Sequence, residues 1–131
     1  MPQKEIELIL LQQCASHLAM PIWLMGENGD LLYYNEPAEP ILGRRFDEVG
    51  EMPGEELAAM FQTTAEDGSP LDAGDLPINI ALRKRRPAHR WMRIKGLDAV
   101  WRKIEVTAFP VEGLRGRHLG AVAIFWEASD R

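Results

Sequence analysis

The chain has 131 residues, of which 46% are hydrophobic and 27% are charged, and its formal net charge at pH 7 is −5. These values indicate one soluble globular domain with a single core, and they exclude a disordered chain. The negative charge disfavours general nucleic-acid binding, and no apolar run approaches the roughly 18 residues of a membrane span, so we expect neither partner.

The first predicted element is a helix from Lys4 to Met20, which contains no Gly or Pro and is followed by Pro21. The apolar surface of this helix is wider than the stripe of a one-sided surface helix. It consists of two adjacent sets of residues: an a/d set of Leu8, Leu11, Ala15 and Leu18, and a neighbouring set of Ile6, Ile9, Leu10 and Cys14. Either one face packs on the domain's own sheet and the other on a second copy, or the whole helix lies in a deep groove of its own domain.

The stretch from Pro21 to Gly43 reads as strand, turn, strand and capped helix. Asn28-Gly29 lies between two apolar runs and predicts a type I′ hairpin turn. Asn35 is then expected to cap a helix through its side-chain oxygen, and Gly43 to take the left-handed position after the last turn.

Two further helices and a turn are expected in the middle of the chain. One helix covers Leu57 to Gln62, and Asp67 to Pro70 form a turn. The other helix is capped by Asp75, carries Pro77 in its first turn, and ends in the basic run before Pro87.

The last third of the chain predicts three long strands. His89 to Leu97 and Val100 to Val111 alternate, and Leu119 to Trp126 is a nearly continuous apolar run, suited to a central strand covered on both faces. With the early hairpin, this order predicts an α+β domain: a five-stranded antiparallel sheet with short helices on one face and an amphipathic helix at the N-terminus.

The order of these elements resembles a bacterial-type PAS domain. The features that carry the resemblance are the hairpin, the strand ending in Asn35, the short helix ending in Gly43, and the D-G-x-P-L turn followed by a D-x-P-x-x-x-A-L helix. The resemblance implies a sensory or interaction module in cytoplasmic signal transduction. It also implies a homodimer or a signalling protein as partner, because a helix before the first strand is a common pairing element in PAS proteins.

We divide the chain into an N-terminal helix for dimerisation or packing at 1–20 and a PAS core at 21–131. The dimer helix would present Ile6, Leu8, Leu11, Ala15 and Leu18. A start at Met1 that runs straight into this helix favours a free-standing PAS protein over a piece of a larger one. Two alternatives stay open: a scaffold domain that dimerises without a ligand, and a small binding protein or enzyme resembling the ketosteroid-isomerase cone.

No residue pattern indicates catalysis or a metal. Cys14 has only His17 as a basic neighbour in sequence, and a single cysteine suits a reducing cytoplasm. The histidines His17, His89 and His118 are far apart and show no ligand spacing. We therefore expect a protein that is not an enzyme.

The resemblance also bears on cofactors. Flavin-adduct light sensors of this kind carry a reactive Cys in the helical region, and haem-binding members present an axial His from the helix that corresponds to Leu76 to Arg85. This chain has neither residue there, and His89 lies just past that helix. Flavin adducts and haem are disfavoured, which leaves an unknown small metabolite.

Such a metabolite would occupy an apolar pocket between sheet and helices, with the Tyr34 hydroxyl and the Trp23 indole as polar groups. The alternative is that the same side chains fill the core. The predicted lining consists of Trp23, Met25, Tyr34, Ile80, Met92, Ile104, Val106, Val122 and Ile124.

The basic run from Arg83 to Arg90 could indicate a nucleic-acid patch. It follows a helix end in an acidic protein, where cations suit the helix dipole. We interpret it as a solvated helix terminus.

Overall fold

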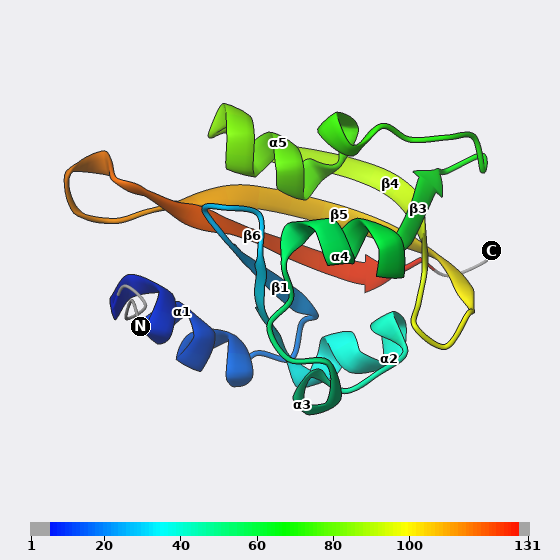
Figure 1. Cartoon of the computed structure of the whole chain (residues 1–131), viewed down its shortest axis with the longest axis horizontal. Helices are drawn as coiled ribbons and strands as arrows, with labels where there is room; N and C mark the ends of the chain where they lie inside the picture. Colours follow the sequence, from blue (N-terminus) through cyan, green and yellow to red (C-terminus); the bar gives the residue numbers. More distant parts are fainter. Residues whose placement is uncertain (1–5, 129–131) are drawn as a thin grey trace.

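One antiparallel sheet organises the molecule. The computed structural model describes residues 6–128, and its sheet has the strand order β2-β1-β6-β5-β4-β3. The strands are β1 (Ile22–Gly26), β2 (Leu31–Tyr34), β3 (Gln62–Ala65), β4 (Ala88–Lys95), β5 (Trp101–Glu112) and β6 (His118–Glu127). As Figure 1 shows, short helices lie between β2 and β4 in the chain, and a longer helix precedes β1. This arrangement confirms the predicted α+β class.

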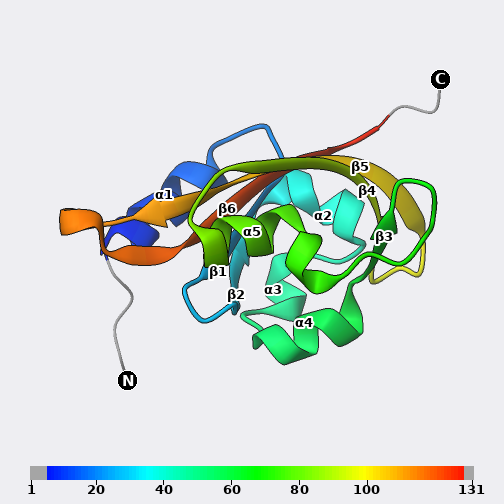
Figure 2. The same ribbon diagram turned by 90° about the horizontal axis from the view of Figure 1, so that it is seen from above.

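The helices are short and lie mostly in the middle of the chain. They are α1 (Ile6–Ser16), α2 (Glu39–Leu42), α3 (Phe46–Val49), α4 (Gly54–Met60) and α5 (Pro77–Lys84), with 3-10 turns η1 (Glu36–Ala38), η2 (Ala73–Asp75) and η3 (Leu114–Gly116). Figure 2 shows the sheet curling around α5, with α2, α3 and α4 inside the same curve. No helix within residues 6–128 is long and apolar enough to cross a membrane.

The sheet has six strands, so the expectation of five was wrong. The predicted helix to Gln62 ends at Met60, and the chain then forms β3, which pairs with the edge of β4. Thr63 and Thr64 favour this extended conformation because they are β-branched. The predicted turn follows directly: Gly68 has φ +90° and its N–H donates to the Ala65 carbonyl.

Side-chain alternation divides the core between the two faces of the sheet. On the inner face, Met25, Met92 and Phe125 pack under the short helices. On the outer face, Leu24 and Val122 pack under α1. β6 lies between β1 and β5 and is covered on both sides, which explains its nearly continuous apolar sequence.

The hairpin between β1 and β2 differs in type from the prediction. Gly29 has a φ of +85°, and among the described residues that are not glycine only Arg85, Ala99 and Arg115 have positive φ. Asn28 therefore does not adopt the conformation of a type I′ turn. The Gly29 N–H donates to the Gly26 carbonyl, and the Gly26 N–H to the Asp30 carbonyl, as in a type I turn followed by a left-handed glycine.

Asn35 holds a different position from the one predicted. It precedes η1, but its side chain makes no capping hydrogen bond. Its amide is fully buried: Oδ1 accepts from the Ile22 N–H at 2.9 Å, and Nδ2 donates to the carbonyls of Ala15 at 2.9 Å and Met20 at 2.8 Å. Asn35 therefore joins the end of α1 to the start of β1.

The same contact accounts for the length of the first helix. The predicted helix ran from Lys4 to Met20, whereas α1 ends at Ser16, and Lys4 lies outside the described residues. The carbonyl of Ala15 accepts from Asn35 and from the Leu18 N–H, which closes the last turn.

Two other helix predictions need correction. Asp75 does not cap α5; it lies in η2, and the residue before α5 is Leu76. Helix α3, which follows Arg45, was not predicted. Gly43, by contrast, ends α2 with φ +85° and ψ +5°, as predicted.

Candidate functional site

A cavity of about 380 Å³ lies between the inner face of the sheet and helices α4 and α5. This volume is at the small end of the range for small-molecule sites, roughly 300–1,000 Å³. Its apolar side chains come from the strands and helices that surround it. They include Trp23, Met25, Leu42, Leu57, Phe61, Ile78, Met92, Ile94, Ile104, Val106 and Phe125.

Five of the nine predicted lining residues are on this cavity. They are Trp23, Met25, Met92, Ile104 and Val106. The period-2 alternation of β1, β4 and β5 places them together, because residues two apart on a strand point to the same face.

Val122 and Ile124 are on the other face of the sheet, so their assignment to the pocket was wrong. Both pack in the cluster under α1. Along β6 the inward side chains are those of Ala123 and Phe125, which line the cavity instead. Since β6 is apolar on both faces, its sequence offers no alternation from which the inner face could be chosen.

Ile80 is partly buried but is not on the cavity; Ile78 of the same helix takes that position. Two residues apart on a helix are separated by about 200°, so their side chains point in opposite directions. The predicted helix was correct, and its inward face was misplaced by half a turn.

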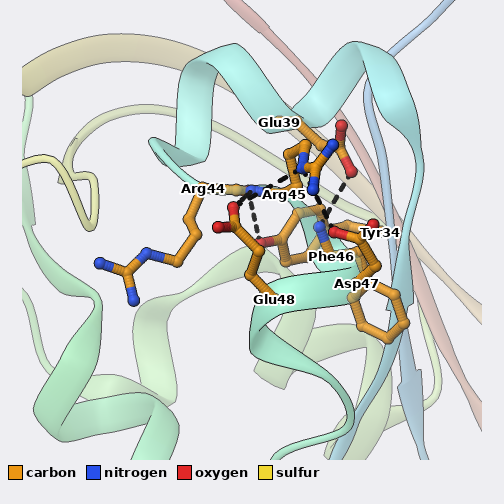
Figure 3. Close-up of polar contacts among 7 residues, drawn as sticks. All are labelled: Tyr34, Glu39, Arg44, Arg45, Phe46, Asp47 and Glu48. Atoms are coloured by element: carbon orange, nitrogen blue, oxygen red, sulfur yellow. Dashed lines mark hydrogen bonds and ion pairs between the residues drawn. The ribbon is translucent and has the colours of Figure 1, made fainter.

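Tyr34 packs behind the lining residue Trp23 and does not itself line the cavity. It is fully buried. Its hydroxyl donates to the Arg44 carbonyl at 2.7 Å (Figure 3). Burial, and after it the Glu39 carboxylate, raises the pKa of Tyr34 to about 12. The hydroxyl is therefore a neutral structural donor.

The loop that receives this hydrogen bond is itself held in place. The Phe46 N–H donates to the Glu39 carboxylate at 2.9 Å, and the Phe46 ring packs against the Tyr34 ring at 5.2 Å in a T-shaped pair (Figure 3). These contacts fix the chain between α2 and α3 on the side of Tyr34 away from the cavity.

Trp23 links this support to the cavity. Its ring stacks on Tyr34 with centroids 6.0 Å apart and meets Phe61 edge-on at 5.4 Å. Its Nε1 is buried and has no hydrogen-bond partner within residues 6–128. Because a buried N–H without a partner costs free energy, Trp23 is held there by its aromatic contacts.

Besides Thr63 and Asn79, the polar part of the lining consists of three residues: Asn28 from the hairpin turn, Glu55 from the first turn of α4 and Arg83 from the last turn of α5. All three are exposed. Sequence reasoning treated Arg83 as a solvated helix end and overlooked the other two. The spacing of Leu57 and Phe61 at i and i+4 could have indicated that this helix faces the cavity.

Helix α1 divides its predicted dimer residues between two environments. Leu8 and Ala15 are buried against the outer face of the sheet, with Leu11 partly buried beside them. Ile6 is 66% exposed, and Leu10 of the neighbouring set is 55% exposed; Leu18, which lies past the end of α1, is 38% exposed. The helix thus has one face packed on its own sheet and an apolar face turned to solvent. The deep-groove alternative does not describe it.

The cavity does not fit a cofactor that needs a cysteine or an axial histidine. Its lining contains neither residue, and Cys14 is exposed on α1. Residues 6–128 contain no group of three or more His, Cys, Asp or Glu side chains that could hold a metal ion. The predictions against a flavin adduct and haem stay predictions.

Comparison with known proteins identifies the fold. No protein-family model matches the chain, and no curated protein matches it. Solved structures do. The PAS domain of a protein from Colwellia psychrerythraea is 15% identical, with a TM-score of 0.67 over 95% of this chain and 99% of that one. The PAS domain of nitrogen regulation protein NR(II) from Vibrio parahaemolyticus is 15% identical, with a TM-score of 0.63 over 91% and 98%.

A LOV protein from Rhodobacter sphaeroides is 12% identical, with a TM-score of 0.70 over 96% of this chain and 70% of that one. Likeness at such identities concerns the fold. This chain is a PAS-fold domain, as the order of its hairpin, helices and three long strands predicted.

Proposed function

We propose that the protein is a cytoplasmic PAS sensory or interaction module in signal transduction. It binds a small molecule in the inner cavity and pairs with a second copy through α1. The observation that carries the proposal is a cavity of about 380 Å³ inside a PAS fold, lined mostly by apolar side chains with a few polar ones among them. The protein acts by binding and not by catalysis, since no nucleophile lies beside a base in the lining.

Ligand binding is tested by native mass spectrometry of the protein as purified and by thermal unfolding with a panel of metabolites. A compound present at 100 times its Kd is expected to stabilise the fold by about 2.7 kcal/mol, which raises Tm by several degrees. If nothing co-purifies and no compound raises Tm, the cavity is not a ligand site, and the scaffold alternative takes its place.

The dimer is proposed on the exposed apolar face of α1. Ile6 and Leu10 are exposed on this face, Leu18 is exposed two residues past the end of the helix, and Glu7 is the only charged residue from Ile6 to Ser16. A second copy presents the same uncharged face, so the two helices can bury each other. A groove beside this face is lined by Ile9, Gln12, Gln13, Ser16 and Tyr33, which are all uncharged.

We expect Leu10→Glu to convert the dimer to a monomer in sedimentation velocity, because it places a charge in an apolar interface. The free energy of unfolding of the variant, measured by thermal unfolding at low protein concentration, should stay within about 0.5 kcal/mol of that of the parent, because Leu10 is exposed in the monomer. Val100→Glu, at an exposed residue in the turn between β4 and β5, is the control and should leave the dimer intact. A parent chain that is monomeric at high concentration would contradict the proposal.

Signalling requires that the two sites be coupled. A ligand that changes dimer affinity must itself bind the dimer and the monomer with different affinities, because coupling is reciprocal. β6 connects them, since Ala123 and Phe125 line the cavity and Val122 packs under α1. A ligand that binds without changing dimer affinity would mean that the cavity does not signal through α1.

A further inference from the structure

Two opposite charges stand at the same end of the cavity. Glu55 and Arg83 come from different helices, and both belong to the lining. Gly29 of the hairpin turn lies between them: its carbonyl oxygen is 2.9 Å from where a Cβ on Gly54 would be, and a methyl of Leu82 is 3.9 Å from where its own Cβ would be. Gly54 and Leu82, the residues that precede Glu55 and Arg83, therefore both lie next to Gly29. This places the two charged side chains at the same mouth of the cavity.

Neither the Glu55 nor the Arg83 side chain is paired with another group within residues 6–128. No ion pair or hydrogen bond of the Glu55 or Arg83 side chain occurs within residues 6–128, although ion pairs such as Arg102 to Asp98 form elsewhere. Each of the two suits the dipole of its own helix end. Their presence on the lining of one cavity is an additional property, because the neighbouring charged residues Glu56 and Lys84 are absent from that lining.

We propose that the cavity takes an α-amino acid with a large apolar side chain, or a compound of the same charge pattern. This inference rests on the proposed function, in which the cavity binds a small molecule. The carboxylate of the ligand pairs with Arg83 and its ammonium group with Glu55 at the mouth. Its apolar side chain lies against Trp23, Phe61 and Phe125 in the interior.

The charge pattern selects this class over simpler ones. A molecule with only a carboxylate would meet the repulsion of Glu55, and a molecule with only an amine would meet that of Arg83. The inner lining has no charged side chain, so the part of the ligand that enters must be neutral and apolar. A zwitterionic head on an apolar body satisfies both conditions.

Four probes with one ring system separate these contributions: L-tryptophan, indole-3-propanoate, tryptamine and 3-ethylindole. Their affinities are measured by isothermal titration calorimetry at low salt, where exposed charges act most strongly. L-tryptophan is expected to bind most tightly. Arg83→Gln should weaken L-tryptophan and indole-3-propanoate about two- to fivefold, the size of an exposed ion pair. The same change should strengthen tryptamine.

Glu55→Gln should do the reverse: it weakens L-tryptophan and tryptamine and strengthens indole-3-propanoate by a similar factor. Lys84→Gln and Glu56→Gln are the matched controls, one residue away on the same helices and off the cavity. They should change each affinity less than the cavity variants do. None of the four variants removes a buried contact, so all should fold.

The results distinguish the two levels of the proposal. If all four probes bind equally and no variant changes an affinity, the cavity remains a ligand site but the amino-acid inference is wrong. If charge matters but the controls act as strongly as the cavity variants, the effect is one of net charge and the inference is also wrong. If no probe binds at any concentration reached, the amino-acid inference fails. If the metabolite panel gives no shift either, the ligand part of the proposed function fails as well.

Discussion

Replacement of Asn35 by alanine is expected to lower the free energy of unfolding by about 3 kcal/mol or more, one of the largest effects available to a single polar residue here. The substitution removes three hydrogen bonds to the main chain: the Ile22 N–H and the Met20 carbonyl lose their Asn35 partner, and the Ala15 carbonyl keeps only the bond from the Leu18 N–H. Each buried group that loses its hydrogen bond costs about 1–3 kcal/mol. Asn35 is fully buried, so water does not replace the amide without local rearrangement.

The loss of stability should be greatest in one part of the chain. Asn35 joins α1 to β1, so hydrogen exchange in its variant should rise first in the amides of Ile6–Ser16. Urea unfolding measures the stability, and exchange detected by mass spectrometry measures the site.

Asn79→Ala is the control, because Asn79 donates one exposed hydrogen bond to the Ala73 carbonyl and should cost less than about 1 kcal/mol. Equal losses in the two variants, or unchanged exchange in α1, would refute the role assigned to Asn35.

Gly43→Ala is expected to destabilise the domain by about 3 kcal/mol, through two costs that add. Gly43 has φ +85°, where an alanine costs about 1–2 kcal/mol. A Cβ at this position would also lie 2.6 Å from the main-chain nitrogen of Asp98 and 2.7 Å from its side chain. Backbone atoms do not move aside cheaply, so overpacking adds about 1–3 kcal/mol.

A matched variant separates these two costs. Gly68 has φ +90° in an exposed turn and has no atom within 4 Å of where its Cβ would be. Gly68→Ala should therefore show the conformational cost alone, about 1–2 kcal/mol. The difference between the two variants in urea unfolding measures the contact with Asp98. If Gly43→Ala costs no more than Gly68→Ala, the segment around Asp98 yields and the contact is not rigid.

Asp98, the residue next to Gly43, is also held by an ion pair. Asp98 accepts a bidentate pair of hydrogen bonds from Arg102, at 3.1 and 2.7 Å, and Arg102 also donates to the Ile41 carbonyl at 3.0 Å. The hydrogen bond from Arg102 holds the pKa of Asp98 at about 2. The turn between β4 and β5 is thereby fastened to the end of α2, next to Gly43.

Much of the fold could be read from local patterns because short-range physics decides them. Gly43 ends its helix in the left-handed region, since glycine has no Cβ to oppose that conformation. The alternation of Met92, Ile104 and Val106 placed them on the inner face, because side chains on a strand alternate regardless of what covers them. Together with Trp23 and Met25, these three strand residues are the five of nine predicted lining residues that line the cavity.

Other features depend on partners distant in sequence, and the sequence by itself does not specify them. Asn35 could have capped its own helix; it bonds instead to Ala15, Ile22 and Met20 because α1 packs against β1. Gln62–Ala65 adopts the extended conformation of β3 because the edge of β4 offers it main-chain hydrogen bonds.

The inner face of β6 belongs to the same group. Ala123 faces the cavity and Val122 faces α1, a choice made by register with β1 and not by hydrophobicity. The sequence by itself determined the order of elements, the special glycines and the strands with clear alternation, because those follow from the conformational limits of each residue. Only the tertiary structure decided where the cavity lies and which charges meet at its mouth, because long-range packing brings Glu55 and Arg83 together from separate helices.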